Sequence, residues 1–335
     1  MIKAFLRPIA AMLACIAVAC VISIIPAREQ SKNENIDLNG DTEQSVEAGN
    51  NSSSQKPYNL LVLGKDQASG LTDVMMLVSF DKVNNKAFVL QLPRDTYVNY
   101  GSSYCKLNGA MRALGEDGLC SFLESSMGID VDGYISLELE GFRALVDSIG
   151  GVEMDITEPL KYSDPSQSLY IDLPAGRQIL NGKQAEMLVR YRSGYARGDL
   201  DRLDVQKRFL AALFVTLKSK ITPLSVYSVA SAALPYLKTN ISASELVFLG
   251  LRVAGMPKEN LSLATLSGED ALSSISGGSF FVVSKPSAEE LLREHFALNG
   301  EFDSEGRFLH PSLDKFKMIY SKKYENRVFS LEELK

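Results

Sequence analysis

The chain has 335 residues and a formal net charge of −6, which argues against a surface built to bind nucleic acid. Hydrophobic residues make up 45% and charged residues 23% of the sequence, as expected for a chain with a sizeable buried core. It contains only two histidines and four cysteines, with no CxxC motif, so a zinc site or histidine-based catalysis is disfavoured.

Residues 1–27 are predicted to form a short cytoplasmic tip and a transmembrane anchor. The stretch from Ile9 to Ile25 is apolar and uncharged, which is just long enough to cross a bilayer as a helix. Lys3 and Arg7 precede it, so the positive-inside rule predicts a cytoplasmic N-terminus and an exported remainder. The alternative is a cleaved signal, or a lipoprotein signal ending at Cys20, but the apolar run continues past that cysteine.

Residues 28–57 are predicted to be a flexible tether between the anchor and the folded part. The segment is rich in Asn, Ser, Glu and Asp and has no aromatic residue. It cannot bury enough apolar surface to offset the conformational entropy that folding would cost.

The first folded elements are predicted to be strands. Tyr58–Gly64 is a short apolar run typical of a buried strand, and Val74–Phe80 and Ala87–Leu92 flank a turn with two asparagines. This pattern predicts an antiparallel hairpin. The hairpin would bring Asp73, before its first strand, close to Arg94, after its second.

Strand and helix patterns then alternate along the rest of the chain. Helices are predicted at 107–127, 139–149, 181–189, 199–220, 243–255 and from Ser287 onward, and strands at 152–156 and 279–284. Such alternation predicts an α/β fold. We expect a three-layer αβα sandwich around a mixed sheet, preceded by one N-terminal transmembrane helix.

The predicted helix at 199–220 carries three polar residues on its apolar side. On a helical wheel, Asp199, Arg202 and Gln206 fall within the arc of the large apolar residues. Lys207 falls on the opposite, polar side. An N-cap at Asp199 paired with Arg202 is the structural alternative, and it accounts for one inward polar residue more easily than for three.

Several arginines could converge near the start of this helix. Arg190 and Arg192 are expected in an extended segment, where residues two apart share a face. The candidate anion-binding residues are Arg94, Arg190, Arg192 and Arg202. Arginines beside carboxylates that can bind Mg²⁺ suit a pyrophosphate substrate, and Asp66 and Asp73 lie at strand ends where they could supply them. A structural ion-pair network is the alternative.

Seven stretches in this order resemble one known family. They are LLVLGKD (60–66), LTDVMMLVSFD (71–81), LQLPRDTYV (90–98), KLNGAM (106–111), LVDSIGGVEMDI (145–156), LNGKQAEMLVRYR (180–192) and GDLDRLDVQKRFL (198–210). Together they resemble the LytR-CpsA-Psr family of cell-wall glycopolymer transferases, over roughly residues 58–220. We therefore expect a catalytic domain at 58–296 and a C-terminal appendage of unknown role at 297–335.

The resemblance implies an activity and its partners. Family members move a glycopolymer, such as wall teichoic acid or capsular polysaccharide, from an undecaprenyl-pyrophosphate carrier to peptidoglycan. The product is a phosphodiester, formed outside the cell membrane of Gram-positive bacteria. The implied cofactor is Mg²⁺, with Mn²⁺ as the alternative ion.

The resemblance also implies residue roles. The pyrophosphate would be bound by Arg94, Arg190, Arg192, Arg202 and Gln206. The metal would be held by Asp66 and Asp73, and the catalytic set would be Arg94, Asp73 and Arg202. Asp95 and Asp199 would support these groups. The carrier lipid would lie in a pocket lined by Val74, Met76, Val89, Phe142, Leu145 and Phe209; for each of these residues, ordinary core packing is the alternative.

Three points stay open from the sequence. The family often has an arginine where this chain has Leu71, which favours the alternative of a non-catalytic polyprenyl-lipid-binding regulator. A polyprenyl-pyrophosphate hydrolase is a further alternative. The general base is not identified, and Asp73 could serve only if the metal does not occupy it. Cys105 and Cys120 would form either a disulfide or two thiols.

Overall fold

The computed structural model describes residues 56–66, 71–100, 103–164, 169–191, 199–220, 232–273, 278–308, 316–324, 328–331 and 333–334. The predicted anchor, and the predicted tether up to residue 55, lie outside these residues. Within the described part, no helix has the length and apolar character needed to span a membrane.

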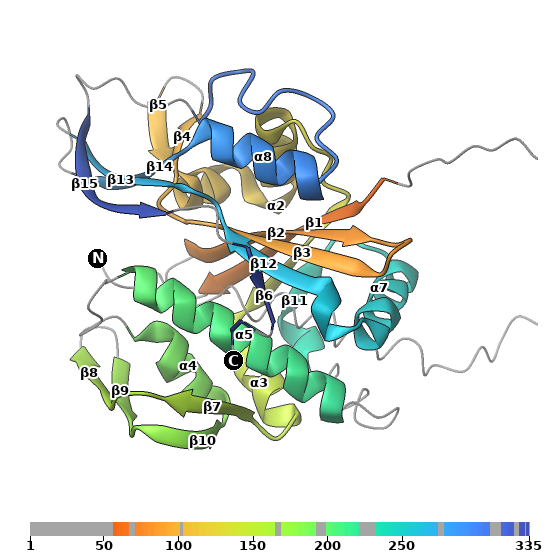
Figure 1. The fold of residues 1–335 in the computed structure, drawn as a ribbon, viewed down its shortest axis with the longest axis vertical. Helices are drawn as coiled ribbons and strands as arrows, with labels where there is room; N and C mark the ends of the chain where they lie inside the picture. The colour runs from red at the N-terminus through yellow and green to blue at the C-terminus, as the bar shows by residue number, and fades with distance from the viewer. Residues whose placement is uncertain are drawn as a thin grey trace, which may run out of the picture.

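A mixed seven-stranded sheet forms the centre of the molecule, with strand order β11-β6-β1-β2-β3-β12-β16 (Figure 1). Its strands are β1 (Tyr58–Asp66), β2 (Leu71–Asp81), β3 (Lys86–Leu92), β6 (Gly133–Glu138), β11 (Leu237–Thr239), β12 (Leu261–Thr265) and β16 (Phe329–Ser330). The pairs β1–β6 and β3–β12 are parallel, and the other neighbours are antiparallel. The predicted α/β fold with a mixed sheet is therefore confirmed, as is the β2–β3 hairpin.

Helices cover both faces of this sheet (Figure 1). They are α2 (Leu107–Met127), α3 (Leu139–Ser148), α4 (Gly182–Arg190), α5 (Asp199–Lys220), α7 (Ala243–Gly255) and α8 (Lys285–His295), with short 3-10 helices η2 (Leu234–Tyr236) and η3 (Lys258–Asn260). Because side chains alternate along a strand, Leu60 and Val62 pack with α3, α4, α5 and α7, whereas Leu61 and Leu63 pack with α2 and α8.

Smaller sheets flank the centre. One three-stranded sheet contains β13 (Gly268–Ser273), β14 (Ser279–Val283) and β15 (Phe316–Tyr324). Antiparallel pairs join β4 (Tyr97–Tyr100) to β5 (Ser103–Lys106), β7 (Val152–Ile156) to β10 (Gly176–Leu180), and β8 (Leu160–Asp164) to β9 (Leu169–Leu173).

One sequence expectation about the C-terminal part needs correction. Helix α8 begins at Lys285 with Ser284 as its N-cap, not at Ser287; proline is accepted in the first helical turn, so Pro286 does not delay the start. Beyond residue 296, described residues pack into the domain: Phe302 and Phe308 are buried against α2 and α8, and β16 extends the central sheet.

The two cysteines of the folded part are free thiols. Burial is the main reason that the pKa of Cys120 rises to about 12. A buried thiol with a raised pKa is unreactive, so we regard Cys120 as part of the core.

Candidate functional site

The predicted site residues of the first three strands gather at one end of the central sheet. Met75 is paired with Leu92 in the β2–β3 ladder, so Asp73 and Arg94 each lie two residues beyond that pair. In the neighbouring ladder Asp66 pairs with Leu71, and the register shifts between Gly64 and Lys65. The backbones of Asp66 and Asp73 are thus on adjacent strands, although their side chains lie outside the described part.

Arg94 lies in the loop after β3, and backbone hydrogen bonds hold this loop in place. Its side chain is 10% exposed, and its Nε lies 3.5 Å from Asp95 Oδ1. Lys106 Nζ lies 3.2 Å from the same oxygen, and Phe281 N donates to the Asp95 carbonyl at 2.8 Å. Asp95 therefore contacts both basic side chains, and its supporting role stays a prediction.

Lys106 was missed as a site residue in the sequence reasoning. It is the last residue of β5 and lies beside Arg94 through their shared contact with Asp95. The signal was present, because Lys106 opens the KLNGAM segment that resembles the family. A second basic group beside Arg94 would strengthen an anion site.

Arg190 occupies a different conformation from the one expected. It is the last residue of helix α4, and Tyr191 is the first extended residue (φ −64, ψ 135). The helix continues this far because Ala185, Leu188 and Val189 pack into the core and Arg190 Nη1 bonds Glu186 Oε1 at 2.7 Å. The expectation that Arg190 and Arg192 share an extended face is therefore wrong for Arg190, and Arg192 lies outside the described residues.

Gln206 connects the separate stretches of the site. Its side chain points inward as predicted, and the residue is 3% exposed. Gln206 Oε1 accepts from Gln91 Nε2 at 3.2 Å, and Gln206 Nε2 donates to the Val189 carbonyl at 3.3 Å. Gln91 Oε1 in turn accepts from Thr265 Oγ1 at 3.1 Å.

These bonds bring three sequence-distant stretches together. Gln91 lies three residues before Arg94, Val189 lies one residue before Arg190, and Gln206 lies one helical turn after Arg202. The loop after β3, the end of α4 and the first turns of α5 therefore meet at one end of the sheet. The side chains of Asp199 and Arg202 lie outside the described part.

Lys207 is a correction to the helical wheel. It was expected on the polar side of α5, but it is 6% exposed. Its Nζ lies 3.1 Å from Asp204 Oδ1 and 4.2 Å from the ring centroid of Phe329. Strand β16, which contains Phe329, covers this side of the helix, and the aromatic face stabilises the buried ammonium.

The six residues predicted to line a lipid pocket all belong to one core cluster between the sheet and the helices. They are Val74, Met76, Val89, Phe142, Leu145 and Phe209, each at most 2% exposed. Met76 and Val89 border a narrow cavity beside Gln206 of about 10 Å³, the space of one water molecule. Lipid binding here stays a prediction.

A buried glutamate lies on the other face of the same sheet end. Glu116, in α2, is 4% exposed and accepts hydrogen bonds from Lys65 and, at 2.9 Å, from Lys238. Burial alone would raise its pKa, but the hydrogen bonds from the two lysines bring the pKa below the usual value. Among the side chains that the structure describes, no group of three His, Cys, Asp or Glu residues could hold a metal.

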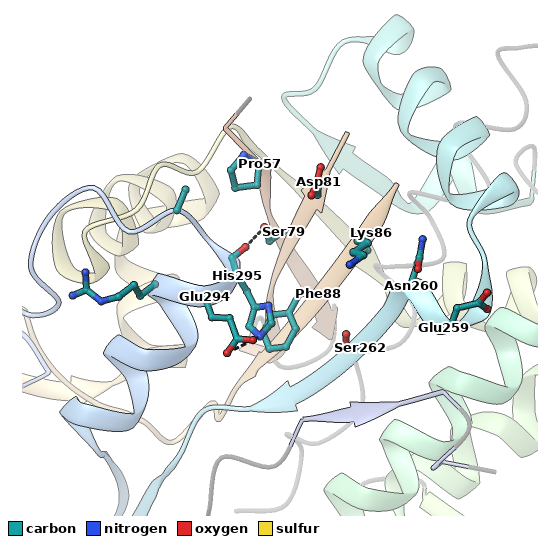
Figure 2. A pocket seen from close by; sticks show the side chains of 13 residues that line it. Pro57, Ser79, Asp81, Lys86, Phe88, Glu259, Asn260, Ser262, Glu294 and His295 are labelled. Carbon is teal, nitrogen blue, oxygen red and sulfur yellow. Dashed lines mark hydrogen bonds and ion pairs between the residues drawn. The ribbon is translucent and has the colours of Figure 1, made fainter. Parts of the chain in front are cut away.

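A separate hollow of about 580 Å³ lies at the opposite end of the β2–β3 hairpin (Figure 2). Asp81, Lys86 and Glu259 line it, and His295 stacks on Phe88 with ring centroids 3.6 Å apart. None of the predicted site residues lines this hollow, so we do not include it in the candidate site.

Comparison with known proteins identifies the fold and the family. A polyisoprenyl-teichoic acid–peptidoglycan teichoic acid transferase, TagV of Bacillus subtilis, is 28% identical over 228 residues, which are 64% of this chain and 58% of that protein. The probable cell wall biosynthesis protein LcpB of Corynebacterium glutamicum is 36% identical over 165 residues, covering 49% of this chain and 38% of that protein. The matched region thus spans less than two thirds of either relative.

The crystal structure of B. subtilis TagV superposes with a TM-score of 0.62 at 24% identity, covering 73% of this chain and 99% of that one. At this level of identity the superposition shows a shared fold. Residues 23–297 match the LytR_cpsA_psr family, a range that includes every segment brought together at the end of the central sheet. The chain is therefore a member of the LytR_cpsA_psr family.

Proposed function

We propose that this chain transfers a teichoic-acid-type glycopolymer from a polyprenyl-pyrophosphate carrier to peptidoglycan. The observation that carries the proposal is the Gln206 network, which joins the stretches of Arg94 and Arg190 at one end of the sheet. The family membership and the printed function of TagV support the same reaction. The crevice at the end of an α/β sheet is also where such folds commonly bind ligands.

In the proposed reaction, a peptidoglycan hydroxyl oxygen attacks the phosphorus attached to the glycan. A new P–O bond forms while the bond to the bridging oxygen breaks, and polyprenyl phosphate leaves with the bond's electron pair. Arg94 and Arg190, with Arg192 and Arg202, would stabilise the negative charge on the phosphate oxygens. The hydroxyl proton passes to a base that we do not assign.

We also propose Mg²⁺ as the cofactor, with Mn²⁺ as an alternative, bound by Asp66 and Asp73. In support, their backbones lie on adjacent strands at the end where Arg94 emerges, and carboxylate oxygens are the preferred protein ligands of Mg²⁺. When bound, the ion would offset charge on the pyrophosphate.

The proposed topology follows from the N-terminal sequence. The apolar run of residues 9–25 would anchor the chain in the cell membrane, and the tether would hold the domain outside, at the surface of a Gram-positive cell. The carrier's polyprenyl chain would then insert between the sheet and helices α3 and α5, which requires the packed core there to open.

Transfer can be tested with the full-length protein in detergent, a lipid-linked glycan and peptidoglycan. We expect Mg²⁺-dependent transfer, abolished in Arg94→Ala and in Arg190→Ala although both variants still fold. Arg177→Ala is the control, because that arginine is 76% exposed and paired with Glu153 away from the site. Wild-type activity in both site variants would refute the assignment.

The same assay separates the other functions. Phosphate release without transfer would indicate a hydrolase, and tight lipid binding without turnover would indicate a regulator. Leu71, where the family often has an arginine, is the sequence feature that favours the regulator. Leu71→Arg should then increase turnover if the missing charge limits the reaction.

A further inference from the structure

A buried carboxylate in helix α4 is bound by two arginines from different helices. Glu186 is 8% exposed. Its Oε1 lies 2.7 Å from Arg190 Nη1, and its Oε2 lies 3.3 Å from Arg143 Nε of α3. Arg143 Nη2 also bonds Glu140 Oε1 at 2.8 Å. The four side chains form a row of alternating charge that ends at Arg190.

Contacts other than this row also hold α3 against α4. A methyl group added to Gly182 would lie 2.3 Å from the Arg143 carbonyl oxygen, so the two helix backbones are already in close contact there. Asp147 Oδ1 also accepts from Gly182 N at 2.7 Å. A buried ion pair costs desolvation that often cancels its attraction, so Glu186 is a poor choice for a merely structural link.

We propose that Glu186 is a positioning residue, which holds the guanidinium of Arg190 in the orientation needed at the reacting phosphate. The inference rests on the proposed function. One hydrogen bond to Glu186 occupies one of the five N–H donors of an arginine, so the same guanidinium can still bind phosphate oxygens. Arg143 and Glu140 complete the row by fixing Glu186 from its other side.

The proposal predicts a split between kcat and KM. The Glu186 carboxylate repels a bound anion, so removing its charge should not weaken substrate binding and should leave KM unchanged or lower. The Glu186 carboxylate also holds the guanidinium of Arg190 in place. A displacement of about 1 Å at a reacting group can lower the rate about a hundredfold. For Glu186→Gln, which keeps the shape, we expect kcat to fall about tenfold without a rise in KM.

The experiment measures transfer kinetics and melting temperature for full-length wild type, Glu186→Gln and Arg143→Met. Arg143→Met removes the contacts of Arg143 with Glu186 Oε2 and Glu140 Oε1 but leaves the bond between Glu186 and Arg190. It should lower kcat by a smaller factor, about threefold, again without raising KM. Glu153→Gln, which breaks an exposed ion pair with Arg177, is the matched control and should match wild type.

The outcomes are distinguishable. If wild type transfers and Glu186→Gln either matches it or shows only a raised KM or a lowered melting temperature, the positioning role is wrong. If Glu186→Gln does not fold, Arg143→Met tests the proposal in its place. An unchanged kcat in Arg143→Met would overturn the proposal, and a lower kcat with an unchanged KM would support it. Absence of transfer by wild type would instead refute the proposed function.

Discussion

Replacing Gln206 by leucine tests whether the buried amide chain holds the site together. The change leaves Gln91 Nε2 and the Val189 carbonyl without their Gln206 partner. Leaving a buried polar group without a hydrogen-bond partner costs about 1–3 kcal/mol. Because the leucine gains some apolar burial, we expect a net loss of about 2–4 kcal/mol in the free energy of unfolding.

Thermal unfolding followed by circular dichroism measures this loss. In a domain of this size about 1 kcal/mol corresponds to a shift of about 2–4 °C, so Gln206→Leu should melt at least about 4 °C lower. Gln178→Leu is the matched control, because its amide donates to the Pro174 carbonyl at the surface and should change stability by less than about 0.5 kcal/mol. A Gln206→Leu protein as stable as the control would show that the amide chain does not stabilise the site.

Three further changes follow from the same structure. Gly182→Ala should destabilise the protein by about 1–3 kcal/mol and impair transfer, because the new methyl group would clash with the Arg143 backbone and displace α4. Gly255→Ala is the control: its new methyl group would have no neighbouring atom within 4 Å, so stability and transfer should be unchanged. Burial raises the pKa of Glu116, but hydrogen bonds from two lysines bring it below the usual value. The ionised Glu116 therefore stabilises the fold above the unfolded-state pKa, and this stabilisation is lost as pH falls through the folded-state pKa. Urea unfolding from pH 7 to 3 should show Glu116→Gln less stable than wild type at neutral pH and equally stable in acid. Burial lowers the pKa of His295, so the folded protein disfavours the protonated imidazole. Wild type should therefore lose stability as pH falls below about 6.5, and the loss should be smaller in His295→Phe. Equal dependence of stability on pH in the two proteins would contradict this.

The features that the sequence predicted well depend on local periodicity. The β2–β3 hairpin follows from two apolar runs around a turn, and its register places Asp73 and Arg94 at one end. Helix α5 begins and ends as predicted, at Asp199 and Lys220. The inward position of Gln206 could be read from the helical period, because that period is fixed by backbone geometry and not by distant partners.

The features that were missed depend on contacts between distant segments. Lys207 is buried because Phe329, 122 residues later in the chain, covers it, and no local pattern encodes that contact. Glu186 and Lys106 were overlooked for a related reason: a charged residue on a helix or short strand is usually solvated. Their importance appears only when Arg143 and Asp95 are placed beside them.

The two buried glutamates suggest how an acidic protein can present a basic site. On one face of the sheet Glu116 binds two lysines, and on the other face Glu186 binds two arginines. The Glu116 group has a formal charge of +1, whereas Glu140 makes the row that contains Glu186 formally neutral. In both groups the cations are held in place by a buried carboxylate. The carboxylates weaken the attraction between these cations and a polyanionic substrate, but they hold the cations in position before the substrate binds. In a chain with net charge −6, such pairing would allow the proposed site to bind phosphate locally without attracting anions over the whole surface.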